Sequence, residues 1–338
     1  MPSFGELLRE ARQRAGLTQT ELAARASLSM RGIQDLERGV RRRPHPASAR
    51  QLADALRLSG EDRRALMDAA VGSAPGATSI GLPPRTTSFV GRGTELARIA
   101  QLLLTSRLIT LCGAGGVGKT RLALEVAFQA SAGQPFEDDV CLVELAEIRD
   151  AELIPSAVAN ALGLREVRRS SIGNAVRDYL RDRAVLVVLD NCEHQIDACA
   201  QLVLSLRGSC PSLTILATSR EPLDVDGEIV WPLAPLEIPD PKRVLSPEHV
   251  LDYPAVRLFV DRACAAQPNF ELTIHNAASV AGICARLQGL PLALELAAAR
   301  IRALPPRQLL DQLARGFDVL ARPSRGVLPR HQTLRTTI

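Results

Sequence analysis

The sequence predicts a multidomain chain in which an all-α unit is followed by an α/β unit with a parallel sheet and then by a second helical unit. Three observations favour this order. Before residue 72, apolar residues recur only at helical spacing. Between residues 107 and 219, four short apolar runs alternate with helical segments, as in strands that are buried on both faces of a parallel sheet. From about residue 250 the spacing is helical again.

Composition sets the limits for this fold. The chain has 338 residues, of which 46% are hydrophobic and only 3% aromatic, enough for two or three cores rich in Leu, Ala and Val. No apolar run reaches eighteen residues, and charges occupy the place of a signal peptide's apolar region, so we expect a cytoplasmic protein without a membrane partner. Seven cysteines, none in a C-x-x-C pair, are expected to be reduced and buried.

The charge distribution points to a partner for the first unit. Residues 1–72 contain thirteen arginines and nine acidic residues, an excess of four that equals the net charge of +4 of the whole chain. The basic excess therefore belongs to the N-terminal unit, where a nucleic-acid partner would require it.

Two short helices are expected within the N-terminal unit. In "LTQTELAARASLSMRGIQDLERG" (17–39), Thr18 and Glu21 form the pattern of a capping box that opens one helix, and a second helix starts after Ser29. Five apolar residues fall where the two helices would share a core: Leu22, Ala23, Leu28, Ile33 and Leu36. With its flanking segments, this stretch resembles the XRE (Cro-repressor-like) helix-turn-helix family over about residues 4–70. One departure is Ser27, where the family usually has a glycine.

The resemblance implies that residues 30–38 form a recognition helix in the major groove of double-stranded DNA. The candidate base readers are Met30, Arg31, Gln34 and Asp35, and the candidate phosphate contacts are Gln19, Arg38, Arg41, Arg42 and Arg43. The alternative is a small protein-binding bundle whose arginines are merely solvated.

The stretch "LITLCGAGGVGKTRLALEVA" (108–127) has the pattern of a strand, a glycine cluster and a helix. Gly113, Gly115 and Gly118 fit the dinucleotide fingerprint G-x-G-x-x-G, whereas residues 113–120 fit the P-loop G-x-x-x-x-G-K-T. A lysine directly after Gly118 belongs to the P-loop motif and is no part of the dinucleotide fingerprint. The chain has only two lysines, Lys119 and Lys242, so a chance match at this position is improbable.

A second feature also favours the P-loop. A P-loop protein needs an acid at the end of a later apolar strand, and "AVLVVLDN" (184–191) supplies Asp190. The acids that a dinucleotide site would need, at residues 137–139, precede the second apolar run instead of ending it. We therefore expect ATP or ADP with Mg²⁺, with Lys119 on the β- and γ-phosphates and with Thr120 and Asp190 as the Mg²⁺ residues.

The candidate phosphate cradle is Gly113, Ala114, Gly115, Gly116, Val117, Gly118, Lys119, Thr120 and Arg121. A metal site at Cys192, Glu193 and His194 is disfavoured, because adjacent residues do not easily converge on one ion.

Three further segments, "TTSFVGRGTELARIAQLL", "LTILATSREPL" and "ICARLQGLPLALELAAARI", resemble the NB-ARC/STAND family of signalling ATPases over about residues 83–330. This family occurs in multidomain bacterial transcriptional regulators. The resemblance implies that the backbone of Val90, Gly91 and Arg92 lies against adenine and that Pro291, in Gly289–Pro291, packs on it. Arg220, in Thr218–Arg220, would detect the γ-phosphate and would join Lys119 and Asp190 as a catalytic candidate.

Two departures from the family limit what the chain is expected to do. Members commonly have a second acid after the Mg²⁺ strand, and here that residue is Asn191, so we expect slow hydrolysis or none. Glu193 is a possible substitute. The chain also stops at "LPRHQTLRTTI", where the family continues into a winged helix, so a truncated member is expected.

The expected domains are a helix-turn-helix domain at 1–71, a Gly/Pro/Ser-rich linker at 72–88, a P-loop NTPase domain at 89–240, a helical domain at 241–330 and the start of a winged helix at 331–338. The expected function is a nucleotide-gated transcriptional regulator that self-associates in its ATP state. One alternative is an active ATPase with an N-terminal docking module, and another is a relic that binds DNA constitutively.

Overall fold

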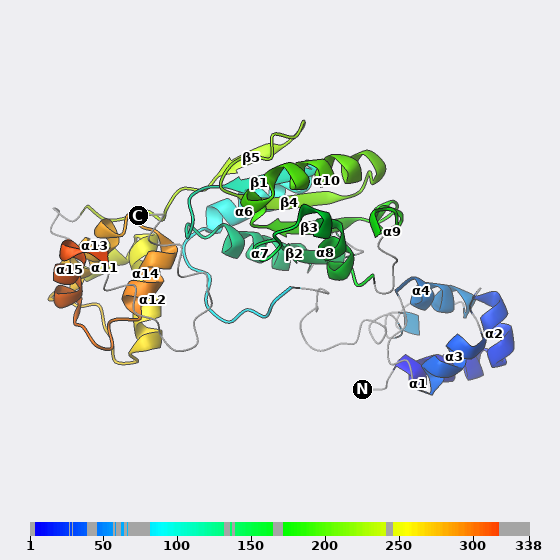
Figure 1. The fold of residues 1–338 in the computed structure, drawn as a ribbon. Coiled ribbons are helices and arrows are strands. Elements are labelled where there is room, and N and C mark those ends of the chain that lie inside the picture. The colour runs from blue at the N-terminus through cyan, green and yellow to red at the C-terminus, as the bar shows by residue number, and fades with distance from the viewer. Residues whose placement is uncertain are drawn as a thin grey trace. The chain divides into compact units, whose positions relative to one another are not determined.

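The structure is a computed structural model that describes residues 4–26, 28, 30–38, 46–56, 58, 62–63, 66, 82–131, 136, 139–164, 172–240 and 246–317. The chain forms two compact units, Met1–Thr78 and Ser79–Ile338 (Figure 1). The expected fold class is confirmed: a helix-turn-helix region precedes a parallel-sheet P-loop fold and a helical region.

The first unit contains the helices α1 (Phe4–Arg14), α2 (Gln19–Arg25), α3 (Met30–Glu37) and α4 (Pro46–Ala55). The expected capping box is present, because the Thr18 hydroxyl accepts the backbone N–H of Glu21 while the Glu21 carboxylate accepts the N–H of Thr18. Leu22, Ala23, Ile33 and Leu36 are buried in the shared core, as predicted, and Leu28 packs on it.

One close approach fixes α1 against α3. A Cβ added to Gly5 would lie 2.3 Å from the carbonyl oxygen of Leu36, so a larger residue at position 5 would push the two helices apart. Beside this contact, Arg12 of α1 forms an ion pair with Glu37 of α3 at 2.6 Å, and both side chains are largely buried. A glycine contact and a buried charge pair therefore join the first and third helices.

A parallel sheet forms the centre of the second unit. Its strands are β1 (Leu108–Cys112), β2 (Asp139–Glu144), β3 (Val185–Asp190), β4 (Thr214–Ser219) and β5 (Ile229–Pro232), in the spatial order β2-β3-β4-β1-β5. All four pairings are parallel. The predicted runs 107–112, 140–146, 184–190 and 213–219 correspond to the first four strands within two residues at each end. The edge strand β5 was not predicted.

Helices cover both faces of this sheet. They are α6 (Gly93–Leu102), α7 (Lys119–Ala130), α8 (Ile154–Ala161), α9 (Ile172–Leu180) and α10 (Ile196–Ser209), with short 3₁₀ turns η1 (Ala151–Leu153) and η3 (Cys192–His194). Side chains alternate between two cores along β3: Leu186 and Val188 face the core of α6 and α7, whereas Val185 and Val187 face that of α8, α9 and α10.

The helical region that follows contains α11 (Pro247–Leu251), α12 (Pro254–Ala266), α13 (Ala277–Arg286), α14 (Pro291–Ala298) and α15 (Pro306–Arg315). Its core is continuous with the core of α6 and α7. All seven cysteines have free thiols; six are buried, and Cys264 is partly exposed. Among the described helices, none combines the length and the apolar character needed to cross a membrane.

Candidate functional site

The glycine-rich turn lies between the end of β1 at Cys112 and the start of α7 at Lys119. Gly116 and Gly118 have φ angles of 75° and 96°, in the left-handed region that favours glycine. A Cβ on Gly113 would lie 2.7 Å from the carbonyl oxygen of Leu233. The turn therefore needs glycine for its conformation and for close packing. It presents the N-terminus of a twelve-residue helix at the carboxyl end of the parallel strands.

Lys119 extends back over this turn. Its Nζ donates to the carbonyl oxygens of Gly113 at 2.8 Å and Ala114 at 3.2 Å, and the residue is 7% exposed. Burial lowers the pKa of Lys119, and the nearby carboxylates of Glu193 and Asp190 partly offset this effect. The lysine predicted from the sequence therefore lies as a buried cation against the first two residues of the turn.

Asp190, the last residue of β3, is the centre of a hydrogen-bond cluster and is 1% exposed. The hydroxyls of Thr120 and Thr218 both donate to its Oδ1 at 2.7 Å, and Asn191 Nδ2 donates to its Oδ2 at 3.3 Å. The structure thus brings the two predicted Mg²⁺ residues, Thr120 and Asp190, into direct contact. A hydroxyl beside a carboxylate at the start of a P-loop helix is an oxygen donor set that fits Mg²⁺.

Asn191 has a structural role that the sequence did not reveal. Its φ of 65° is in the left-handed region, which asparagine tolerates better than most residues. Its backbone N–H donates to the hydroxyl of Thr218 at 3.0 Å. Asn191 and Thr218 therefore fix the orientation of the Asp190 carboxylate, and strand order explains how, since β4 with Thr218 lies between β1 and β3.

Arg220, the predicted phosphate sensor, follows β4 directly beside the P-loop. The carbonyl oxygen of the preceding Ser219 accepts the N–H of Gly113 at 3.3 Å. Arg220 Nε pairs with Glu193 Oε1 at 3.3 Å, and the exposed fractions of the two side chains are 44% and 10%. Arg220 thus lies between the P-loop and the turn η3, in contact with an acid from η3.

The helical region contacts the P-loop through the start of α14. The backbone N–H of Leu292 donates to the carbonyl of Gly116 at 3.2 Å, and Pro291 Cγ would lie 3.8 Å from a Cβ on Gly118. Gly289, just before this helix, has a φ of 66°, and a Cβ there would lie 2.1 Å from the carbonyl oxygen of Leu236. The proline predicted to pack on adenine is therefore held next to the glycine-rich turn.

The segment Val90–Arg92 contacts the P-loop through the side chain of Arg92. The buried guanidinium of Arg92 donates to the carbonyl oxygens of Val117 at 2.9 Å and Ala234 at 2.7 Å. Burial lowers the pKa of Arg92. Val90 packs on the core, and Gly91 has a φ of 77°. The side chain of Arg92 supports the turn, a contact that the sequence did not predict.

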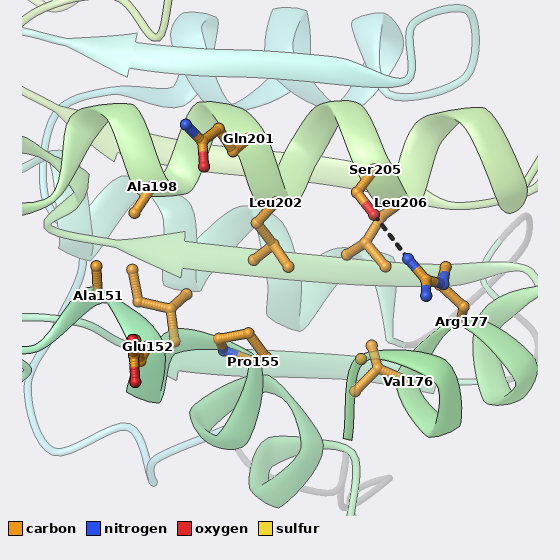
Figure 2. Close-up of a pocket in the computed structure, with 12 residues that line it drawn as sticks. Ala151, Glu152, Pro155, Val176, Arg177, Ala198, Gln201, Leu202, Ser205 and Leu206 are labelled. Carbon is orange, nitrogen blue, oxygen red and sulfur yellow. Dashed lines mark hydrogen bonds between the residues drawn. The ribbon is translucent and has the colours of Figure 1, made fainter. Parts of the chain in front are cut away.

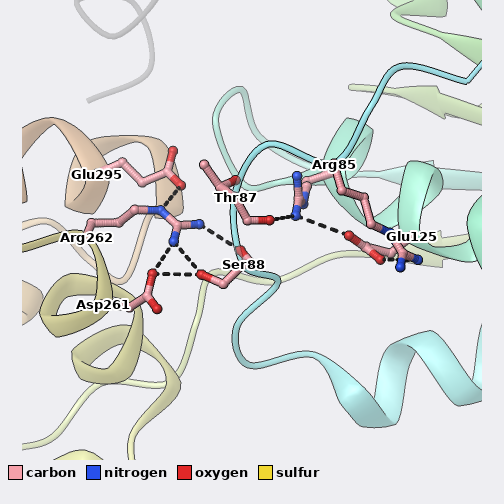
Figure 3. Close-up of polar contacts among 8 residues, drawn as sticks. Arg85, Thr87, Ser88, Glu125, Asp261, Arg262 and Glu295 are labelled. Carbon is pink, nitrogen blue, oxygen red and sulfur yellow. Dashed lines mark hydrogen bonds and ion pairs between the residues drawn. The ribbon is translucent and has the colours of Figure 1, made fainter. Parts of the chain in front are cut away.

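Arg121, predicted to bind nucleotide, has other partners. It donates to the carbonyl oxygen of Thr87 and pairs with Glu125 one turn later at 3.1 Å. Arg85 pairs with the same Glu125 at 3.0 Å (Figure 3). The Arg85 guanidinium also lies 4.5 Å from the ring centroid of Phe128. Arginines at 85 and 121 therefore fasten the segment 85–88 to the P-loop helix.

The same segment also contacts the helical region. Arg262 of α12 donates to the Ser88 hydroxyl at 2.7 Å and to its carbonyl oxygen at 2.8 Å, and Ser88 donates to Asp261 at 2.7 Å (Figure 3). Arg262 also pairs with Asp261 and, at 2.9 Å, with Glu295 of α14. The segment 85–88 thus joins α7 to α12, and through Arg262 to α14; α7 and α14 both begin at the P-loop.

A separate groove of about 400 Å³ lies among α8, α9 and α10 (Figure 2). Arg177 and Ser205, joined by a 3.1 Å hydrogen bond, lie at one end of it. None of the residues predicted to contact nucleotide lines this groove.

The candidate DNA residues are only partly described. Met30, Gln34 and Arg38 follow one another along one face of α3 and its last turn; Met30 is 47% exposed and Arg38 is exposed, whereas Ile33 and Leu36 point into the core. Gln19 instead donates to Glu37 at 2.7 Å. Arg31 and Asp35 belong to α3, but their side chains are outside the described residues, as are Arg41, Arg42 and Arg43.

Comparison with known families agrees with the division of the chain into two compact units. Residues 3–66 match the family described as a helix-turn-helix domain, and residues 103–221 match the family described as an AAA domain. The first match covers the four described helices of the first unit, and the second covers the P-loop, Asp190 and Arg220. The chain therefore carries a helix-turn-helix domain and a P-loop ATPase domain.

Several proteins from other organisms are similar to part of this chain. A Mycobacterium tuberculosis protein named as an HTH-type transcriptional regulator is 46% identical over 237 residues, which are 70% of this chain and 25% of that protein. The HTH-type transcriptional repressor RghR of Bacillus subtilis is 43% identical over 61 residues, 18% of this chain and 45% of that protein. The chain thus spans about a quarter of the length of the mycobacterial relative.

Among solved structures, a STAND protein with a tetratricopeptide repeat sensor from Pyrococcus horikoshii has a TM-score of 0.43 and 18% identity, over 72% of this chain and 34% of that chain. A likeness at this level carries no conclusion about function.

Proposed function

We propose that this chain is a DNA-binding transcriptional regulator controlled by ADP or ATP, bound with Mg²⁺ at the P-loop. One observation carries the proposal: the Thr120 hydroxyl meets the buried Asp190 carboxylate at 2.7 Å, at the start of the helix that carries Lys119. The oxygens of Thr120 and Asp190 are suited to Mg²⁺, and the neighbouring Lys119 is suited to phosphate. Thr120 and Asp190 are brought together from positions 70 residues apart.

Each residue of the site has a distinct task. Lys119 neutralises the phosphates, and the N–H groups of residues 113–118 cradle them. Thr120 and Asp190 hold Mg²⁺, and Arg220 contacts the terminal phosphate. We place adenine between Val90–Arg92 and Pro291. Bound nucleotide supplies the terminal phosphate whose presence or absence distinguishes the two states of the switch.

The site is suited to switching more than to turnover. Asn191 occupies the place where an acid would activate water, and its amide donates to Asp190 instead. An amide cannot accept the proton of an attacking water, so hydrolysis is slow or absent. An active ATPase with a docking bundle would instead turn over at about 1 s⁻¹ or faster.

The hydrogen bond between Leu292 and Gly116 connects the P-loop directly to the helical region. Since α14 begins on the P-loop, a rearrangement of that turn by the terminal phosphate moves or releases the helical region. We propose that this change governs self-association in the ATP state and exposure of the helix-turn-helix domain. The domains would be 1–71, 89–240 and 241–330, with a linker at 72–88.

The DNA contacts are proposed along α3. Met30 and Gln34, with Arg31 and Asp35, would face base edges, and Arg38 would contact phosphate. Gln19 would reach phosphate only by leaving Glu37. Because the chromosome is the proposed partner, the protein would act in the cytoplasm.

Calorimetric titration of the full chain with Mg²⁺-ADP and Mg²⁺-ATP tests the nucleotide site. The wild type should bind both, and Lys119→Ala should weaken binding at least tenfold, because it removes the charge on the phosphates. Lys242→Ala, which removes the only other lysine, is the matched control and should bind like the wild type.

Addition of EDTA should weaken ATP binding in the wild type, because Thr120 and Asp190 act through Mg²⁺. Absence of binding in the wild type, or equal binding by Lys119→Ala, would refute the site. A nucleotide-insensitive melting temperature would favour the relic, because a ligand that binds the native state raises its stability.

A further inference from the structure

The contact between Arg220 and Glu193 has a consequence for phosphate recognition. Arg220 is the residue proposed to contact the terminal phosphate, yet its Nε donates to Glu193 Oε1. A guanidinium that is paired with a carboxylate has to exchange or share that partner in order to contact a phosphate. Glu193 therefore stands in direct competition with the γ-phosphate.

The environment of Glu193 makes this competition effective. Its side chain is only 10% exposed, and its Oε2 is buried with no hydrogen-bond partner among the described residues. A buried carboxylate that accepts a hydrogen bond from a single cation depends on that cation. Arg220, in contrast, is 44% exposed and can turn toward a ligand at the P-loop.

The pair is also weak enough to be displaced. Charge-assisted N–H···O hydrogen bonds are usually about 2.7–2.9 Å long, whereas Arg220 Nε and Glu193 Oε1 are 3.3 Å apart. Partly exposed ion pairs contribute little free energy. A phosphate dianion held by Lys119 and Mg²⁺ would therefore displace Glu193 as the partner of the Arg220 guanidinium.

We propose that Glu193 is a positioning residue that holds Arg220 away from the terminal phosphate and so sets the preference of the site for ADP over ATP. The inference rests on the proposed nucleotide switch and deepens it. ADP has no γ-phosphate to compete for Arg220, so ADP binding leaves the pair intact. ATP binding draws Arg220 away from Glu193, so the Glu193–Arg220 latch weakens the affinity for ATP alone.

The test is the ratio of two dissociation constants, those of Mg²⁺-ADP and of the Mg²⁺-bound β,γ-imido analogue of ATP, which is not hydrolysed. In Glu193→Gln, the shape of the side chain is kept and its charge is lost. The analogue should bind about two- to fivefold more tightly than in the wild type, the range expected for a partly exposed ion pair. ADP should bind within a factor of about two of the wild type, because the pair does not oppose it.

A simple charge effect has to be separated from the latch. Removal of any negative charge near the site weakens repulsion of all phosphates, and Glu221→Gln, an exposed acid next to Arg220, is the matched control for it. In an Arg220→Ala background, Glu193→Gln should no longer change the ratio, because the latch needs both partners. A double-mutant cycle on the ratio therefore isolates the coupling of the two residues.

The outcomes separate this inference from the function that it rests on. An unchanged ratio in Glu193→Gln, or an equal change in the Arg220→Ala background, would overturn the latch while leaving the nucleotide site intact. A lower affinity for the analogue would mean that Glu193 aims Arg220 at the phosphate, which also contradicts the proposal. If wild type and variants bind neither nucleotide, the proposed site itself is wrong.

Discussion

Replacement of Thr218 by valine removes one hydroxyl and keeps the shape of the side chain. That hydroxyl donates to Asp190 at 2.7 Å and accepts the N–H of Asn191 at 3.0 Å, and Thr218 is fully buried, so no water can replace it. A hydrogen bond to a charged group contributes about 1.5–3 kcal/mol and a neutral one about 0.5–1.5 kcal/mol. We therefore expect Thr218→Val to lower the free energy of unfolding of the second unit by about 2–4 kcal/mol.

The assay follows the second unit alone. Trp231 is the only tryptophan of the chain and lies in β5, paired with Leu111 of β1, so urea unfolding monitored by its fluorescence reports this unit. The matched control is Thr110→Val in β1. Thr110 is equally buried, and its hydroxyl has no hydrogen-bond partner among the described residues.

The same substitution should therefore have opposite consequences at the two positions. An unbonded buried hydroxyl costs about 1–3 kcal/mol, so Thr110→Val should be neutral or stabilising. Equal destabilisation by the two substitutions, or a change below about 0.5 kcal/mol in Thr218→Val, would refute the role given to Thr218 in fixing Asp190.

Two further substitutions test other parts of the structure. Gly289→Ala places a Cβ 2.1 Å from the Leu236 carbonyl at a φ of 66°, so the same fluorescence assay should show a loss of at least about 2 kcal/mol; a neutral variant would contradict the close contact. In the first unit, burial raises the pKa of Glu37, but the hydrogen bonds from Arg12 and Gln19 outweigh this, and its net pKa is lowered. The stabilisation is therefore present above the ordinary glutamate pKa and is lost as the pH falls through the lowered one. Arg12→Met should reduce this acid-dependent part of the melting curve of the helix-turn-helix unit, measured by circular dichroism, and leave the smaller part that Gln19 contributes; an unchanged pH dependence would exclude the ion pair as a cause.

The fold was largely predictable because its strands are contiguous apolar runs. β1, β3 and β4 are buried at every position, and each was predicted. β5 was missed because it is a four-residue edge strand whose residues alternate between partly buried and exposed and which ends at Pro232. Burial on both faces leaves a strong signal in the sequence, whereas a short edge strand leaves little.

The site was predictable only where a motif fixes the chemistry. The contact between Thr120 and Asp190 follows from two motifs whose strands end at the same edge of a parallel sheet. The role of Thr218 depends on β4 lying between β1 and β3, an order that periodicity does not reveal. The pairing of Arg121 with Glu125 was not predicted, although their four-residue spacing on one helix indicates it.

The most direct test of the central claim is the affinity of the full chain for DNA in its two nucleotide states. Duplexes selected by the wild type from a random library would be titrated at one salt concentration, with Mg²⁺-ADP and then with the Mg²⁺-bound imido analogue of ATP. We predict that the two dissociation constants differ at least fivefold in the wild type and in Lys242→Ala, and that Lys119→Ala abolishes the difference. Equal affinities in the two states of the wild type, with both nucleotides bound, would contradict nucleotide control of DNA binding.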